Sequence, residues 1–591
     1  MSGFDFNNTI YQTPVTASFV DDSAMNGNSG SGLGNVLAII AESKNLPPFT
    51  PVKFSSYREA LAYPLDPSET VLLKALEKAF APSAEAAVSG PDYVWVVNPR
   101  SDSQASLVLK DVGGIDAVNV HANLYGSNGQ KIYLAIATGT LQGTVSRTVT
   151  IKNSNIVGAN NTVTASNIIS DVFTISYAGS ATVATVQTVL LDNVPHLQVT
   201  VGTQQTDLSF AVYSSVGGLL EALNQIDGVT AVVKNAILLT KATDRLDAIT
   251  TAASLTASGG VTVRSLLDAV ITAINTLSPW LSASRTTAAV LVKEPVVFAS
   301  KALTYTTSVL PTFDQWQTAF DALKNVPCHW LTCLSDEDNV HQMLSAHVNY
   351  MSDVAFQERR GIVGIPSGSA NDDALAKAEA LNNPRVSLVH QGFYDLNSDN
   401  LMAMYPPMVL AALLAGMMCG VTAGTPLTNK TVAVSDMASR LRNPEDTDVL
   451  LPGGVLCCWR DYQGNVRVLQ SVSTSQNADN FNQHEMSTGV ASDYVARALR
   501  EAVAPLLGAK NTPYLPAQLK AVVASRLKQL AIPEPLGEGV IVGDNTSPAW
   551  RGLTVTQALD SNRISVQVSP VIPNNYIGIS IYDVPYTGTR A

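Results

Sequence analysis

Runs of consecutive apolar residues alternate with stretches of helical periodicity in the first and last parts of the chain. Residues 36–40 (VLAII) and 93–97 (YVWVV) are continuous apolar runs, which predict strands buried on both faces. Between them, residues 70–80 carry their leucines at helical spacing and predict an amphipathic helix. The same alternation resumes in the second half and ends in expected helices at 491–507 and 515–530. This order predicts a central mixed sheet with helices on its faces.

The middle of the chain, from about 110 to 295, has a different pattern. Short stretches rich in Thr, Val and Ser alternate apolar and polar residues, which is typical of antiparallel strands. Two segments within it, 219–232 and 266–283, resemble each other, and each indicates a short helix followed by a strand. Because the α/β pattern is continuous without this region, we interpret it as one insertion or a pair of insertions.

The two chain ends have the character of arms. The first 34 residues are polar and rich in Asn, Ser and Gly, so they cannot bury enough apolar area to fold alone. Both ends nevertheless contain apolar residues that could form strands if another chain supplied the edge. These strand candidates are Ile10, Tyr11, Val15, Phe19 and Val20 at the N-terminus, and Ile564, Val566, Val568, Ile577, Ile579 and Ile581 at the C-terminus.

These patterns predict a multidomain α+β or α/β protein, in which a discontinuous α/β core carries β-rich insertions and extended strand-forming arms. The predicted parts are an N-terminal arm and linker (1–34), the first part of the core (35–110), the β-rich inserted outer domain or domains (111–295), the continuing α/β domain (296–400), the C-terminal core (401–560) and the C-terminal strands and arm (561–591).

Composition narrows the classes of function. Of the 591 residues, 46% are hydrophobic and only 14% are charged, against the roughly 25% charged residues of an ordinary soluble domain. Such a neutral surface suits burial against neighbouring molecules. The net charge of −12, with scattered basic residues, argues against a nucleic-acid coat.

One segment could be mistaken for a membrane span. Residues 408–424 (MVLAALLAGMMCGVTAG) are uncharged but fall short of the roughly 20 residues needed to cross a bilayer. We expect a buried helix here, and no direct membrane insertion.

The candidate reactive residues form no convincing constellation. Cys328 and Cys333 flank His329, but no second pair follows at zinc-site spacing, so we expect the five cysteines to be reduced and mostly buried. Arg359 and Arg360 precede an apolar strand and could bind phosphate, although a solvated strand start is the favoured interpretation. We expect no enzyme activity, no metal and no cofactor.

The order of these elements resembles the contractile tail sheath proteins of bacteriophages. Four stretches carry the likeness: VLAIIAESKNLPPFTPVKFSSYREAL, FDALKNVPCHWLTCLSDEDNVHQMLSAHVNYM, YPPMVLAALLAGMMCGVTAGTPLTNKTV with the following Gly-Gly strand, and RISVQVSPVIPNNYIGISIYDV. The likeness spans about 35–105 and 300–590, whereas 110–295 is only generally similar to the family's variable outer domains.

The resemblance implies a structural subunit that forms hexameric rings around an inner tail tube and contracts to drive the tube through the host envelope for genome delivery. It implies as partners further copies of the chain, the inner tube protein, and baseplate and tail terminator or neck proteins, with no nucleic acid. It places the protein in the virion tail, after assembly in the host bacterial cytoplasm. The candidate tube contacts are Arg497, Arg500, Lys520, Arg526 and Lys528.

Three other interpretations stay open at this point. The Thr/Ser/Asn-rich insertion is compatible with a β-rich surface or virion adhesin. A tailocin or another contractile injection system would need the same sheath. An α/β enzyme with a β insertion would need a deep polar pocket.

Overall fold

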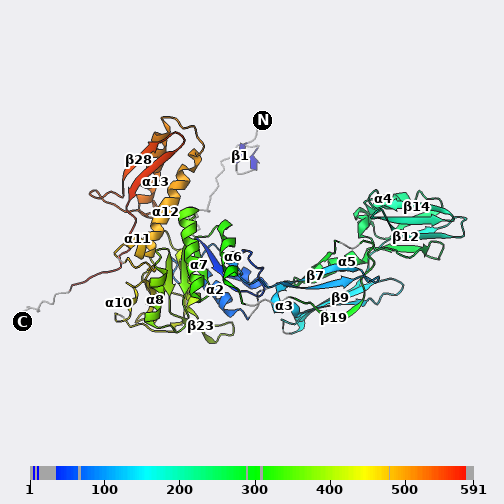
Figure 1. The fold of residues 1–591 in the computed structure, drawn as a ribbon, viewed down its shortest axis with the longest axis horizontal. Helices are drawn as coiled ribbons and strands as arrows, with labels where there is room; N and C mark the ends of the chain where they lie inside the picture. The colour runs from blue at the N-terminus through cyan, green and yellow to red at the C-terminus, as the bar shows by residue number, and fades with distance from the viewer. Residues whose placement is uncertain are drawn as a thin grey trace, which may run out of the picture.

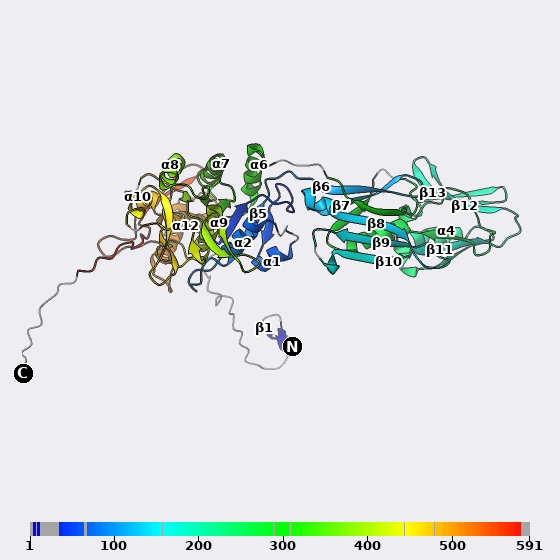
Figure 2. The ribbon, with the colours of Figure 1, turned by 90° about the horizontal axis from the view of Figure 1, so that it is seen from below.

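The computed structural model describes residues 4–6, 9–11 and 35–580, apart from 64, 66, 67, 157, 288, 289, 306–309, 443 and 478. The molecule is elongated: an α/β body carries a C-terminal module at one end, and two β-rich modules extend from its side in a row (Figures 1 and 2). These parts follow the predicted fold class, a multidomain chain of mixed helices and sheets.

The α/β body is built on an eight-stranded sheet in the order β27-β26-β22-β21-β20-β3-β5-β4. The strands from β26 to β5 are parallel, and β27 and β4 pair antiparallel at the two edges. Its strands are β3 (Val36–Ile40), β4 (Val52–Phe54), β5 (Tyr93–Val97), β20 (Trp330–Cys333), β21 (Arg360–Gly364), β22 (Val386–Val389), β26 (Val455–Arg460) and β27 (Val466–Gln470). The continuous apolar runs thus form strands covered on both faces.

Helices cover both faces of this sheet. One face packs against α1 (Tyr57–Ala62), α2 (Thr70–Phe80) and α9 (Pro407–Gly420). The other face packs against α6 (Phe313–Ala322), α7 (Asp338–Asn349), α8 (Asn371–Leu381) and α10 (Thr447–Leu450). A small sheet, β24-β23-β25, lies beside the first face and consists of β23 (Phe393–Leu396), β24 (Met402–Tyr405) and β25 (Asp436–Met437).

The apolar helix expected within 408–424 is α9, and it is buried on all sides. Its small residues allow close approach: a Cβ on Gly416 would lie 2.4 Å from the Ala79 carbonyl oxygen of α2, and one on Gly420 would lie 1.7 Å from the Ser89 carbonyl oxygen. Among the described residues, no helix is both long and apolar enough to cross a membrane. The prediction of a buried core helix is confirmed.

The first β-rich module, here called the proximal module, interrupts the chain between β5 and α6. It contains a sheet in the order β10-β9-β8-β19 and a second in the order β18-β7-β6. Its elements are β6 (Gln104–Lys110), β7 (Asp116–Tyr125), α3 (Gly126–Gln130), β8 (Ile132–Thr138), β9 (Arg147–Asn153), β10 (Thr162–Ile168), α5 (Leu266–Leu277), β18 (Leu281–Arg285) and β19 (Phe298–Ala302).

The second module, here called the distal module, is inserted into the first between β10 and α5. Its sheets have the orders β14-β13-β12-β16 and β15-β11-β17. Its elements are β11 (Asp171–Tyr177), β12 (Ala184–Leu191), β13 (Val194–Val201), β14 (Gln204–Ser209), α4 (Val216–Leu223), β15 (Val229–Val233), β16 (Ala253–Ser254) and β17 (Val261–Arg264). Each module has its own buried apolar core.

The two modules share most of their topology, which accounts for the resemblance between the segments at 219–232 and 266–283. They differ in the third strand of the second sheet, which is β6, at the start of the proximal module, and β17, at the end of the distal one. In each, a three-strand meander gains a fourth strand, and a helix leads to a strand that pairs with the middle of the second sheet. In each, an asparagine at the helix end clamps that strand. Asn275 accepts from the Ala283 amide at 2.7 Å and donates to its carbonyl at 3.0 Å, and Asn224 does the same with Ala231 at 2.7 and 3.4 Å.

The C-terminal module consists of α11 (Phe481–His484), α12 (Met486–Val503), α13 (Leu515–Ala531) and a hairpin of β28 (Trp550–Gln557) and β29 (Asn562–Val568). Its apolar core joins the two long helices to the hairpin.

The strand pairing places two boundaries elsewhere than the sequence predicted. The insertion begins at β6 and ends at β19, outside the predicted 111–295, and the predicted division at 560 falls inside the β28–β29 hairpin.

Candidate assembly surfaces

At the N-terminus, two of the predicted arm residues lie in a described strand. Ile10 and Tyr11 belong to β2 (Thr9–Tyr11), which pairs antiparallel with β1 (Phe4–Phe6) of the same chain. Val15, Phe19 and Val20 lie outside the described residues.

At the C-terminus, Ile564, Val566 and Val568 differ from the expected lone strand. They lie on β29, which pairs antiparallel with β28, and their half-buried side chains pack on the core of the C-terminal module. The physical reason is that the helices α12 and α13 leave an apolar surface that the alternating face of β29 covers. The intrachain hairpin therefore replaces the lone strand, and no third strand joins it among the described residues.

The chain beyond β29 stays docked for several residues and then leaves the body. The Val571 amide donates to the Val540 carbonyl at 3.0 Å, and the Asn575 amide oxygen accepts from the Thr428 hydroxyl at 3.0 Å. After Asn575 the apolar side chains are exposed: Ile577 by 78% and Ile579 by 81%. Ile581 lies outside the described residues. These exposed isoleucines at alternate positions have the pattern of a β-strand, but among the described residues they belong to no sheet.

Two of the five candidate tube contacts have exposed side chains on α13. Lys520 and Lys528 are exposed. Arg526, on the same helix, is instead held by Glu538, with its Nη1 2.5 Å from Oε1 and its Nη2 3.1 Å from Oε2. Arg526 is therefore committed to an intrachain ion pair.

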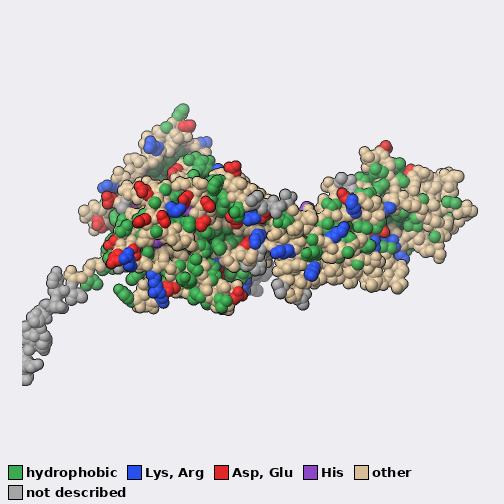
Figure 3. Space-filling view, turned by 60° about the horizontal axis from the view of Figure 1, so that its bottom comes forward, with side chains coloured by type: hydrophobic (Ala, Val, Ile, Leu, Met, Phe, Trp, Pro, Cys, Tyr) green, Lys and Arg blue, Asp and Glu red, His purple; other side chains and the backbone are tan. Residues whose placement is uncertain are grey.

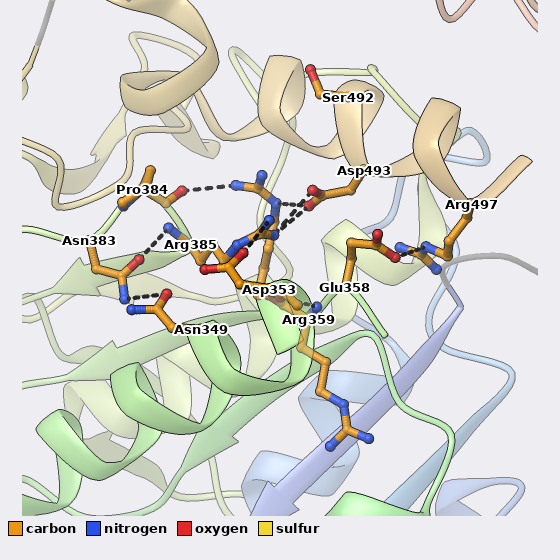
Figure 4. Close-up of polar contacts among 12 residues, drawn as sticks. Asn349, Asp353, Glu358, Arg359, Asn383, Pro384, Arg385, Ser492, Asp493 and Arg497 are labelled. Carbon is orange, nitrogen blue, oxygen red and sulfur yellow. Dashed lines mark hydrogen bonds and ion pairs between the residues drawn. The ribbon is translucent and has the colours of Figure 1, made fainter. Parts of the chain in front are cut away.

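The remaining two candidates, Arg497 and Arg500 of α12, share the buried carboxylate of Glu358, and Figure 4 shows Arg497 beside it. The Arg500 Nη2 lies 2.5 Å from Glu358 Oε1, and the Arg497 Nε lies 3.4 Å from Oε2. The Glu358 side chain is only 6% exposed and comes from the loop that leads into β21. Arg497 and Arg500 thus tie α12 to the α/β body through Glu358, and their contact with a tube stays a prediction.

A second polar cluster joins the same two parts. Asp493 of α12 accepts from the Arg360 Nε at 2.7 Å and from the Arg385 Nη1 at 3.0 Å, and Figure 4 shows Arg385 directed at the Asp493 carboxylate. Arg360 also donates to the Pro384 carbonyl at 2.9 Å. A Cβ on Gly489, one turn before Asp493, would lie 2.4 Å from the Arg360 Nη2, so the helix approaches closely only because that residue is glycine.

Arg359 points away from this cluster into the body. It donates to the carbonyls of Leu323 at 3.0 Å and Val326 at 2.8 Å, and its Nη1 lies 2.9 Å from the His347 Nε2. Burial, with the nearby Arg359 charge, lowers the pKa of His347 to about 3, so its neutral ring can accept this bond. The expectation of a solvated strand start at Arg359 and Arg360 was therefore wrong. Both are buried; Arg359 is hydrogen-bonded inside the body and Arg360 is paired with Asp493.

The other reactive side chains show no assembled chemistry. All five cysteines are buried free thiols, as expected. In the parts of the chain that the structure describes, no group of three or more His, Cys, Asp or Glu side chains could hold a metal ion. The sequence analysis did not identify the roles of Asp493 and Glu358. For Asp493 the available signal was a charged residue on an otherwise buried helix face, whereas Glu358 lies in a loop and has no such signal.

The comparisons with known proteins agree with this architecture. No family model matches the chain. The chain is 25% identical to the tail sheath protein of Bacillus phage SP01 over 99% of this chain and 98% of that protein. It is 25% identical to a putative tail sheath protein of Enterococcus phage phiEF24C over 82% of this chain and 83% of that protein. Among solved structures, the fold is similar to a sheath tail protein of Listeria innocua, with a TM-score of 0.51, 12% identity and coverage of 94% of this chain and 96% of that one.

Replacing Asp493 tests whether this carboxylate holds α12 on the body. We expect Asp493→Ala to lower the free energy of unfolding by about 3–5 kcal/mol, because two buried guanidinium groups lose their counter-charge. The matched control is Asp353→Ala, since Asp353 contacts the same Arg385 at 3.6 Å but its side chain is 66% exposed. Its loss should cost less than about 1 kcal/mol. Denaturant unfolding of the monomeric variants measures both, and equal losses would contradict the assignment.

Proposed function

Since the chain belongs to the contractile tail sheath protein family of bacteriophages, we propose that it assembles as hexameric rings, stacked into a helical sheath around an inner tail tube. Its role as a structural subunit of a contractile sheath rests on the likeness to phage tail sheath proteins along nearly the whole chain. In this proposal the sheath contracts and drives the tube through the host envelope.

One observation carries the proposal that neighbouring subunits are linked through their ends. The segment after Asn575 leaves the body with Ile577 and Ile579 exposed at alternate positions, the pattern of a strand that awaits a sheet. The β28–β29 hairpin is a sheet of only two strands among the described residues, so it has edges that a strand from another subunit can extend. Such covalently continuous arms keep the lattice connected while the bodies slide.

Contraction then requires no fuel and no cofactor. If the extended lattice lies above the contracted one by a few kcal/mol per subunit, many copies acting together supply the work. The subunit acts without enzymatic chemistry. Its further partners are the baseplate and the tail terminator or neck proteins, and assembly takes place in the host cytoplasm. It binds no nucleic acid and does not insert into the membrane.

In this proposal, α13 contacts the tube. Lys520 and Lys528 are the two sequence candidates that are exposed and have no ion-pair partner among the described residues, so acidic residues of the tube protein can approach them.

Truncation tests the arm. A chain ending after Asn575 keeps the hydrogen bonds of Val571 and Asn575 to the body, and loses Ile577 and Ile579. We expect a folded monomer with unchanged thermal stability that forms no cylinders, measured by size exclusion and negative-stain microscopy. The control replaces Leu559, which is 98% exposed in the β28–β29 turn, with Asp and should assemble. Striated cylinders from the truncated chain would rule the arm out.

Charge reversal tests the tube contact. The double variant Lys520→Glu/Lys528→Glu should fold and self-assemble, but should bind the purified tube protein at least about tenfold more weakly at low salt, because attraction becomes repulsion. Lys234→Glu, an exposed lysine of the distal module, is the control and should bind as the wild type does. Undiminished tube binding by the double variant would contradict the assignment.

A further inference from the structure

Residues 572–575, here called the strap, connect the C-terminal module to the departing chain end. Val571, just before the strap, is firmly anchored. Its amide donates to the Val540 carbonyl, and its Cγ1 would lie only 2.5 Å from a Cβ on Gly424, so it packs where only a glycine leaves room. Figures 1 and 3 show the described chain beyond the strap leaving the body as a single extended segment.

The middle of the strap is loosely packed. Residues 572–574 make no hydrogen bond to the described part of the chain. Ile572 is 51% exposed and borders a hollow of about 490 Å³, which is also lined by Pro570, Asn480 and Phe481. The middle of the strap therefore contributes little to holding it in place.

The far end of the strap is held by one side chain. Asn575 accepts from the Thr428 hydroxyl at 3.0 Å, and its Nδ2 donates to the Glu485 Oε2 at 3.3 Å. Thr428 lies in the loop after α9, and Glu485 directly precedes α12. The strap thus has a firm anchor at Val571 and a light one, of two neutral donors, at Asn575.

Glu485 can lose this bond at low cost. It is 1% exposed, and it accepts from Ser471 at 2.7 Å, Ser487 at 3.1 Å and Gln470 at 3.0 Å. Among the described residues it has no ion-pair partner. Three of its four bonds remain when Asn575 leaves, and Asn575 is only half-buried, so water can enter in its place and replace the lost donor.

The attachments along the arm act in series, and Asn575 is the weakest of them. On one side, α12 is fixed to the body by the ion pairs of Asp493 and Glu358, and breaking a buried ion pair costs more than breaking a neutral hydrogen bond. On the other side, a strand added to a neighbouring sheet is held by several backbone hydrogen bonds at once. A pull along the arm therefore breaks the two bonds of Asn575 first.

We propose that Asn575 is a releasable latch of the C-terminal arm. When a neighbouring copy that holds the arm moves during contraction, Asn575 leaves Thr428 and Glu485, and the arm then pivots at Val571. The four freed residues add about 13 Å of reach, at about 3.3 Å each. The latch rests on the proposed sheath function, because it requires an arm that is bound to a second copy.

Hydrogen exchange of the monomer tests the latch without a lattice. Asn575→Ala removes both bonds, so the Val571 amide should exchange about tenfold faster, as measured by mass spectrometry of peptides. The matched control is Asn574→Ala, at the exposed neighbouring position, and it should exchange as the wild type does. The amides of α12 should keep their wild-type rates in both variants. An unchanged Val571 rate in Asn575→Ala would overturn the latch.

A disulfide across the latch tests its release in the lattice. Thr428→Cys/Asn575→Cys places two thiols where side-chain atoms lie 3.0 Å apart, and all five native cysteines are buried, so mild oxidation should close this bond alone. We expect the oxidised double variant to form cylinders of wild-type length that do not shorten under conditions that contract wild-type cylinders. Reduction should restore contraction, and each single variant should contract with or without the oxidant.

The outcomes separate the latch from the sheath function itself. If the oxidised double variant contracts as the reduced one does, the latch is overturned and the sheath function stands. The same holds if only the reduced form assembles, because the docked strap would then be incompatible with the extended lattice. A wild-type chain that forms no cylinders with its tube protein would overturn both.

Discussion

The buried carboxylate of Asp493 determines how the C-terminal module is attached to the rest of the chain. It lies between Arg360 and Arg385, two guanidinium groups at the amino ends of neighbouring parallel strands. Without it, α12 would face two buried positive charges. Glu358 makes a parallel connection further along the same helix. The sheet, α12 and the β28–β29 hairpin that packs on α12 are therefore connected to one another.

Charge is used differently inside and outside this body. Inside, a few ion pairs connect elements that are remote in sequence. The pairing of Asp395 with Lys74 and Lys78 holds β23 against α2, as the pairing of Asp493 holds α12 against the sheet. Over the whole chain only 14% of the residues are charged, and apolar side chains remain exposed on the surface. A rigid body with neutral, apolar contact surfaces suits a subunit that exchanges one set of neighbours for another when the lattice contracts.

The sequence predicts the interior of this fold well because burial leaves a local pattern. The apolar runs of β3 and β5, the periodicity of α2 and the small residues of α9 each indicate directly which sides of the element are buried. The alternation in the middle region likewise indicated inserted β structure. The sequence pattern only suggested that the middle region holds two similar modules, and it did not show that one is inserted into the other. The reason is that strand order depends on pairings between distant segments.

The candidate contact residues were predicted less well, since an arginine on a helix looks the same whether it is free or paired. Arg500 meets Glu358 across 142 residues of sequence, and Arg360 meets Asp493 across 133. No local pattern reports such pairs. The contractile sheath assignment is best tested by electron microscopy of the purified chain mixed with the proposed tube protein. A sheath subunit should form striated hollow cylinders that shorten and widen on contraction, whereas a population of discrete monomers or short spikes would contradict the assignment.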